Sequence, residues 1–89
     1  MNWEEYSFVV RSKERKRIFL LLVRPKTPSE ISRELSKKAA QVSRTLKQFS
    51  EKGLVECKTP NYKIGRVYAL TKKGEKLLEH FKEKRLISF

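Results

Sequence analysis

Apolar residues recur three or four positions apart in four stretches of the chain, which is the spacing of one buried face on an amphipathic helix. The helices predicted from this pattern span residues 13–23, 28–36, 39–52 and 72–85. In the last of them Leu77, Leu78 and Phe81 are expected to face the core.

Capping residues mark where these helices begin and end. Ser12 is placed to cap the helix at 13–23, and Thr71 the helix at 72–85. Thr27 has the pattern of a capping box: Pro28 follows it directly, and Glu30 lies three positions after it. Gly53 is a typical residue to end the helix at 39–52.

Two short segments, 54–58 and 66–71, predict a pair of strands, and the residues between them supply turn chemistry. They would form a hairpin with a long tip. The first eleven residues fit two patterns, because Tyr6, Phe8 and Val10 alternate like the residues of a strand, whereas Trp3, Tyr6 and Val10 are also spaced like a helical face. Both interpretations of this first segment stay open.

The predicted helix at 39–52 has two distinct faces. Ala39, Val42, Leu46 and Phe49 fall within an arc of about 80°, a narrow apolar stripe that should face inward. Arg44 lies at the centre of the opposite face, which is otherwise small and polar. An outward face of this kind can hydrogen-bond the edges of bases.

The order of elements is helix, helix, short break, helix, hairpin and helix. This order predicts an α+β, mainly α, winged helix-turn-helix in which a two-stranded β-hairpin forms the wing and a helix ends the domain. Nothing in the sequence resembles a linker, so residues 1–89 are expected to form one domain.

The charge of the chain changes the functional picture. Its 22 Lys and Arg face 10 acidic residues, giving +12, and eleven of the basic residues but only three Glu lie between residues 33 and 73. Such a charge attracts polyanions. No apolar run approaches the length of a membrane span, and the first residues lack the pattern of a signal peptide, so we expect a cytoplasmic protein that does not enter the membrane.

Residues suited to catalysis or metal binding are scarce. The chain has one Cys, one His and no Asp, which excludes an internal disulfide, a zinc cluster and a Ser-His-Asp triad. We therefore predict no enzyme, no metal and no cofactor. Cys57 is expected to be a buried thiol on a strand, and His80 a surface residue beside Glu79.

An ordered series of short segments resembles a known family. Its pieces are Thr27-Pro28-Ser29-Glu30-Ile31, Val42-Ser43-Arg44-Thr45-Leu46-Lys47, Lys52-Gly53-Leu54-Val55-Glu56-Cys57 and Gly65-Arg66-Val67-Tyr68-Ala69-Leu70-Thr71-Lys72-Lys73-Gly74. Together they are similar to archaeal winged-helix transcriptional regulators of the ArsR and MarR kind. Such regulators usually carry Gly and an aliphatic residue in the turn where this chain has Ser36 and Lys37.

The resemblance and the outward face together predict sequence-specific binding of double-stranded DNA. The helix at 39–52 would lie in the major groove, and the hairpin tip at 58–66 would contact the flanking backbone or the minor groove. The residues predicted to contact DNA from the helix are Lys38, Ala40, Gln41, Ser43, Arg44, Lys47 and Gln48. Those predicted from the hairpin are Lys58, Asn61, Tyr62, Lys63 and Arg66.

The two ends of the chain are more apolar than a small domain can easily hide, which predicts a homodimer formed through the terminal segments. The residues assigned to this dimer are Trp3, Tyr6, Leu78, Phe81, Leu86 and Phe89. Alternatively, these segments pack on their own domain.

Two other functions are consistent with the same positive charge and predicted fold. The protein could be a non-specific architectural DNA- or RNA-binding protein, because charge alone does not select a sequence. It could also be a winged-helix module whose basic face meets an acidic protein.

Overall fold

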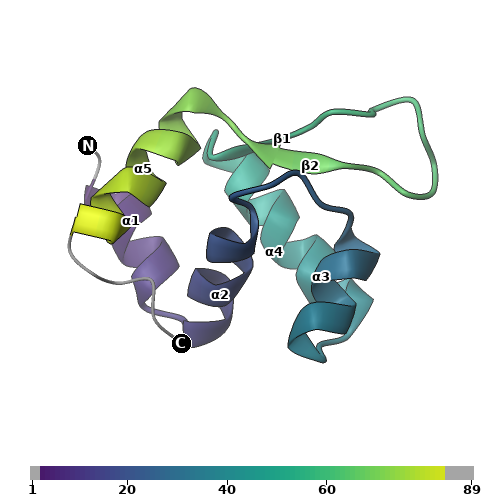
Figure 1. Cartoon of the computed structure of the whole chain (residues 1–89), viewed down its shortest axis with the longest axis horizontal. Coiled ribbons are helices and arrows are strands. Elements are labelled where there is room, and N and C mark those ends of the chain that lie inside the picture. The colour runs from purple at the N-terminus through teal and green to yellow at the C-terminus, as the bar shows by residue number, and fades with distance from the viewer. Residues whose placement is uncertain (1–2, 84–89) are drawn as a thin grey trace.

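The computed structural model describes residues 3–83, which form five helices and one antiparallel hairpin. The helices are α1 (Trp3–Val10), α2 (Lys13–Leu21), α3 (Pro28–Leu35), α4 (Ala39–Glu51) and α5 (Lys72–Glu83), and the strands are β1 (Val55–Cys57) and β2 (Tyr68–Leu70). The fold is a winged helix-turn-helix, mainly helical, as the order of elements predicts. Figure 1 shows α1 and α5 together at one end of the molecule, and α3 and the hairpin loop at the other.

The capping signals are confirmed. The Ser12 hydroxyl accepts a hydrogen bond from Arg15 N (3.2 Å), and Thr27 and Glu30 form both bonds of the capping box. Thr71 Oγ1 accepts from Gly74 N (3.1 Å) at the start of α5. These side chains satisfy N–H groups that a helix leaves unpaired at its first turn.

Gly53 ends α4 as expected. It adopts a φ of +73°, and the N–H groups of Gly53 and Leu54 donate back to Ser50 O and Phe49 O, both at 2.9 Å. This is the Schellman arrangement, in which a left-handed residue turns the chain out of the helix.

The segment that the sequence left open, residues 1–11, forms helix α1 where it is described. Val9 is fully buried in the core, and Arg15 of α2 holds α1 in place: its Nε donates to Phe8 O (2.6 Å), and its guanidinium lies 4.1 Å from the centre of the Phe8 ring. The helical interpretation is therefore correct: Trp3–Val10 forms a helix that packs against α2, and in the described chain it pairs with no strand.

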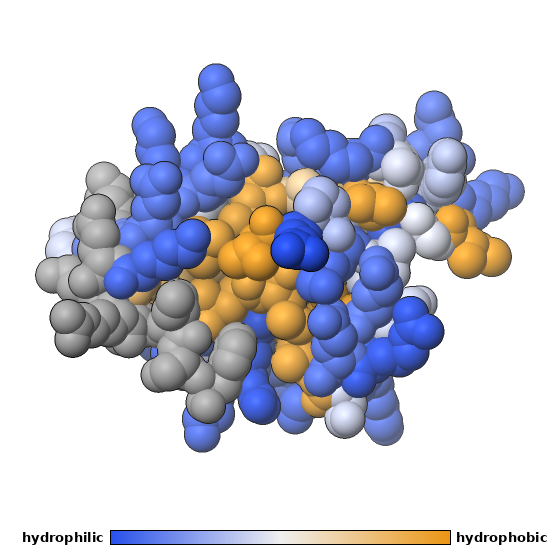
Figure 2. Space-filling model, viewed as in Figure 1, coloured by the Kyte–Doolittle hydropathy of each residue, from blue (hydrophilic) through white to orange (hydrophobic). Residues whose placement is uncertain are grey.

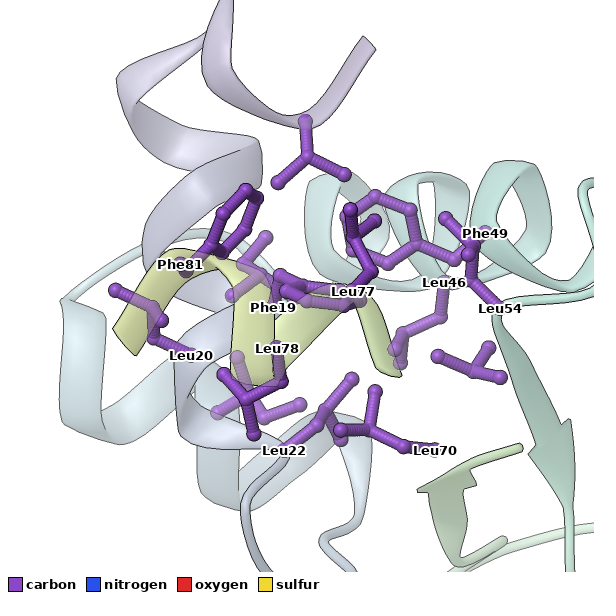
Figure 3. Close-up of a cluster of buried hydrophobic side chains, with 14 of the residues drawn as sticks. Phe19, Leu20, Leu22, Leu46, Phe49, Leu54, Leu70, Leu77, Leu78 and Phe81 are labelled. Atoms are coloured by element: carbon purple, nitrogen blue, oxygen red, sulfur yellow. The ribbon is translucent and has the colours of Figure 1, made fainter. Parts of the chain in front are cut away.

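The core lies where α2, α4 and α5 meet. Phe19 is central, with its ring 5.6 Å from that of Phe49 and 5.5 Å from that of Phe81, both in edge-to-face geometry. Figure 3 shows leucines of α2 and α5 packed around it. Leu77, Leu78 and Phe81 are buried, as their spacing predicts.

The hairpin pairs Val55 with Leu70 and Cys57 with Tyr68, and both strands are shorter than predicted. A third segment, unpredicted, joins the sheet: Lys26 N donates to Tyr68 O (3.0 Å) and Tyr68 N donates to Lys26 O (2.8 Å). β2 therefore has hydrogen-bond partners on both sides. The wing is fixed through Lys26 to the chain that leads into α3.

Three expectations about burial need correction. Ala39 is exposed, because it stands at the very start of α4, whereas Thr45, assigned to no face, is buried there. His80 is half-buried against the rings of Tyr6 and Trp3, and Cys57 is only half-buried, because β1 is short and lies at the edge of the sheet.

Among residues 3–83, no helix combines the length and apolar character needed to cross a bilayer.

Candidate nucleic-acid interface

The turn between α3 and α4 sets the angle at which α4 is presented. Ser36 adopts the left-handed conformation (φ 54°, ψ 44°) in the position where glycine is common. Lys37 N donates to Ser32 O (3.0 Å), and the Ser32 hydroxyl donates to Lys37 O. These bonds close the turn with no glycine, so that α4 begins at Ala39, as predicted.

The outer face of α4 is open. Lys38, Ala40, Gln41, Ser43, Arg44 and Lys47 are exposed, and Gln48 is half-buried. Within residues 3–83, the side chains of Gln41, Arg44 and Lys47 form no hydrogen bond or ion pair. The inner face is closed by Val42, Leu46 and Phe49, all fully buried. The helix can therefore be contacted from outside without disturbing the core.

The first turn of α4 is also free of a side-chain cap. Lys38 occupies the N-cap position and contributes no capping hydrogen bond, and Ala39 and Ala40 beside it are small and exposed. Backbone N–H groups at an open helix start can donate to an anion.

The wing gathers its predicted residues at one loop. Asn61, Tyr62, Lys63 and Arg66 are all exposed on it, and Arg66 Nε donates to Tyr62 O (2.6 Å). Lys58 differs from them, because its Nζ lies 2.6 Å from Glu56 Oε1 in an exposed ion pair. Figure 1 shows this loop extending away from the helices.

One exposed residue of this loop is not among the predicted contacts. Ile64 is 90% exposed, the highest value among the exposed large apolar residues of the described chain. Figure 2 shows apolar atoms at the outer end of the wing among hydrophilic ones. The signal was an aliphatic residue between Lys63 and Gly65 in a segment otherwise typical of a turn.

The residues assigned to a dimer are not equivalent in the structure. Trp3 is 66% exposed and Tyr6 is half-buried, with the two rings 5.5 Å apart. Leu78 and Phe81 are buried inside the subunit, which corrects their assignment to a surface between subunits. Leu86 and Phe89 lie outside the described residues.

No group of three or more His, Cys, Asp or Glu that could hold a metal ion occurs in the described part of the chain. In this region the carboxyl of Glu30, in the first turn of α3, has a lowered pKa. Hydrogen bonds from the backbone N–H and then the side chain of Thr27 lower the pKa of that carboxyl.

Comparison with known proteins agrees with this architecture. A family model described as HVO_A0261 N-terminal domain matches residues 3–86. No curated protein matches the chain in sequence.

Solved structures with the same fold include regulators of transcription. A MarR/EmrR family transcriptional regulator from Acinetobacter sp. ADP1 is 29% identical, with a TM-score of 0.67 over 79% of this chain and 51% of that one. A mutant of MarR from E. coli is 25% identical, with a TM-score of 0.70 over 89% of this chain and 61% of that one. The chain thus spans between half and two thirds of these two proteins.

A third structure shows the fold alone. A mutant of the type III plasmid segregation protein TubR is 13% identical, with a TM-score of 0.78 over 93% of this chain and 91% of that one.

Proposed function

The chain belongs to the family described as HVO_A0261 N-terminal domain, and from this membership and the geometry of α4 and the wing we propose that it is a sequence-specific, double-stranded DNA-binding regulator of transcription. In this proposal residues 1–89 act as one DNA-binding domain, an archaeal member of the ArsR/MarR-like group. α4 lies in the major groove, and the wing contacts the flanking backbone.

The observation that carries the proposal is the state of Arg44. Its guanidinium is exposed at the centre of the outer face of α4 and has no intramolecular partner among the described residues. An unpaired guanidinium can donate two parallel hydrogen bonds to O6 and N7 of guanine. Gln41 lies one turn earlier on this open face and can pair with adenine in the same way.

Contacts to phosphate would supply the rest of the affinity. Lys38, at the open start of α4, and Lys63 and Arg66, on the wing, are exposed cations. Figure 1 shows the wing loop at the end of the molecule opposite α1 and α5. If about 6–10 phosphates are neutralised in a complex, affinity should fall by about 10³–10⁵ between 50 and 200 mM salt.

We propose further that the protein acts in the cytoplasm as a homodimer, in which Trp3 and Tyr6 form the described part of the contact. A dimer would place two copies of α4 about 34–36 Å apart on a palindromic site. The indole of Trp3, 66% exposed and 5.5 Å from the half-buried ring of Tyr6, supports this arrangement, because the two rings form an apolar surface that a second subunit would cover.

Selection of bound duplexes from a random DNA pool at fixed salt tests the proposal. A regulator should yield a defined site that it binds about 10³-fold or more tightly than random duplex. Equal affinity for all duplexes, or for RNA, would identify an architectural protein instead. No binding to any duplex at about 100 µM protein would favour a protein-interaction module.

A further inference from the structure

The tip of the wing carries an apolar side chain that the contacts proposed above do not use. Ile64 is 90% exposed, well above the 57% of Val23 and the 58% of Tyr62. A single exposed aliphatic residue is ordinary on a protein surface. Its position at the end of an extended, basic loop is the feature to explain.

The loop holds Ile64 outward by its own hydrogen bonds. Tyr62 N donates to Thr59 O (3.1 Å), Val67 N donates to Thr59 Oγ1 (3.0 Å), and Arg66 Nε donates to Tyr62 O (2.6 Å). Gly65 has a φ of +73°, so the chain turns back directly after Ile64. The loop is closed on itself, and Ile64 is at its outer turn.

The surroundings of this side chain favour a nucleic-acid partner. Residues 59–67 contain two cations, Lys63 and Arg66, and no acid. An apolar tip between cations matches the minor groove of DNA, where the phosphates line the edges and the floor is formed by base edges. The major groove is already assigned to α4.

We propose that Ile64 lies on the floor of the minor groove beside the site read by α4, and that it selects against guanine there. This inference rests on the proposed function. A·T pairs present only acceptor atoms on that floor, whereas a G·C pair adds the exocyclic 2-amino group of guanine. An aliphatic side chain displaces water from the acceptor atoms of every pair, but under a G·C pair it also leaves the amino group without a hydrogen bond, so G·C pairs under the tip weaken binding more.

Two synthetic duplexes isolate this contact. Poly(dI–dC) and poly(dG–dC) present the same O6 and N7 acceptors in the major groove and differ by the 2-amino group in the minor groove. Affinities are measured for both by fluorescence anisotropy at one salt concentration of about 100 mM. The wild-type protein should bind poly(dI–dC) about fivefold or more tightly than poly(dG–dC).

Three variants then test whether Ile64 causes the preference for poly(dI–dC). Ile64→Ala should bind the two duplexes alike. Val23→Ala, which removes an exposed aliphatic side chain outside the wing, should keep the full preference. Lys63→Ala should weaken binding to both duplexes by the same factor, because the proposed contact of Lys63 is to phosphate, which both duplexes share. Ile64 is almost wholly exposed, so its replacement leaves the fold intact, which circular dichroism verifies.

The outcomes separate the two hypotheses. Failure of the wild-type protein to bind either duplex at about 100 µM protein, where non-specific binding of DNA is already detectable, contradicts the proposed function itself. Binding to both without preference, or a preference that survives in Ile64→Ala, overturns the role of Ile64 and leaves DNA binding intact. Loss of binding to phosphatidylserine vesicles in Ile64→Ala, with no change on either duplex, would also overturn it and make the tip a membrane contact.

Discussion

Lys73, near the start of α5, forms an ion pair with Glu5 of α1. The same ammonium group donates to Lys52 O (3.1 Å) at the end of α4, so one side chain joins three helices. The two partners differ in environment: the side chain of Glu5 is 9% exposed, and that of Lys73 is 52% exposed.

Removal of the lysine should therefore cost more than removal of the carboxylate. Lys73→Ala leaves a charged group unpaired in a nearly dry site, which should lower the free energy of unfolding by about 1–3 kcal/mol. Glu5→Gln leaves a lysine that water can solvate, and its cost should be smaller. Chemical denaturation compares the two, with Lys72→Ala as the control at an exposed neighbouring lysine. Equal losses would contradict this account.

Gly74 is required by the close approach of α5 to the start of β1. A Cβ atom at this position would lie 2.2 Å from Leu54 O, which is a backbone atom and cannot rotate away. Gly74→Ala should destabilise the protein by about 2 kcal/mol or more, although alanine is the better helix former.

The control for Gly74 is another glycine of the chain. At Gly65 a Cβ would meet nothing within 4 Å, but the φ of +73° is left-handed. Gly65→Ala should cost only about 1 kcal/mol, from backbone conformation. Thermal unfolding of both variants compares the two losses of stability. A smaller loss of stability in Gly74→Ala than in Gly65→Ala would show that α5 can shift.

Arg44 and Lys63 should affect DNA binding in different ways. Arg44→Ala should cost about 1–3 kcal/mol on the selected site and relax the preference at one base pair. Lys63→Ala should weaken every duplex alike and lower the slope of log affinity against log salt by about one. Titrations on selected and random duplexes distinguish the two, and identical behaviour on all sequences would rule out base recognition by α4.

Glu30 should make the stability of the protein fall in acid. The pKa of its carboxyl is lowered in the folded state, chiefly by the hydrogen bond from Thr27 N. Its contribution is therefore complete above the pKa of the unfolded chain, and is lost as the pH falls through the lower folded value. The loss begins near the ordinary glutamate pKa of about 4.3 and continues below it.

The melting temperature between about pH 6 and pH 3 measures this effect. Glu30→Gln should remove part of the acid-induced decrease. Glu51→Gln is the matched control, because Glu51 is exposed and has no hydrogen bond or ion pair in the described chain. A decrease as steep in Glu30→Gln as in the wild type would exclude the capping box as its source.

Trp3 should matter for self-association. Trp3→Ser removes the most exposed aromatic side chain of α1 and should weaken the proposed dimer by about tenfold or more. Sedimentation equilibrium measures the effect, with Val23→Ala as the control. A wild-type protein that stays monomeric at about 100 µM would contradict the dimer.

Local signals predicted the frame of the molecule well. The Thr27 capping box, the Ser12 cap and the end of α4 at Gly53 all depend on residues within one turn of each other, so the sequence shows them directly. The open face around Arg44 follows from the helical repeat in the same way.

The sequence by itself therefore determined the order of the elements from α2 onward and the face of α4 that stays open. The tertiary structure decided what depends on distant neighbours: that Phe81 lies inside the subunit, that His80 packs on Tyr6, and that Lys26 completes the sheet. It also brought Ile64 to the end of the wing. The physical reason is that caps and helical faces arise within a few residues, whereas burial depends on which remote segments meet.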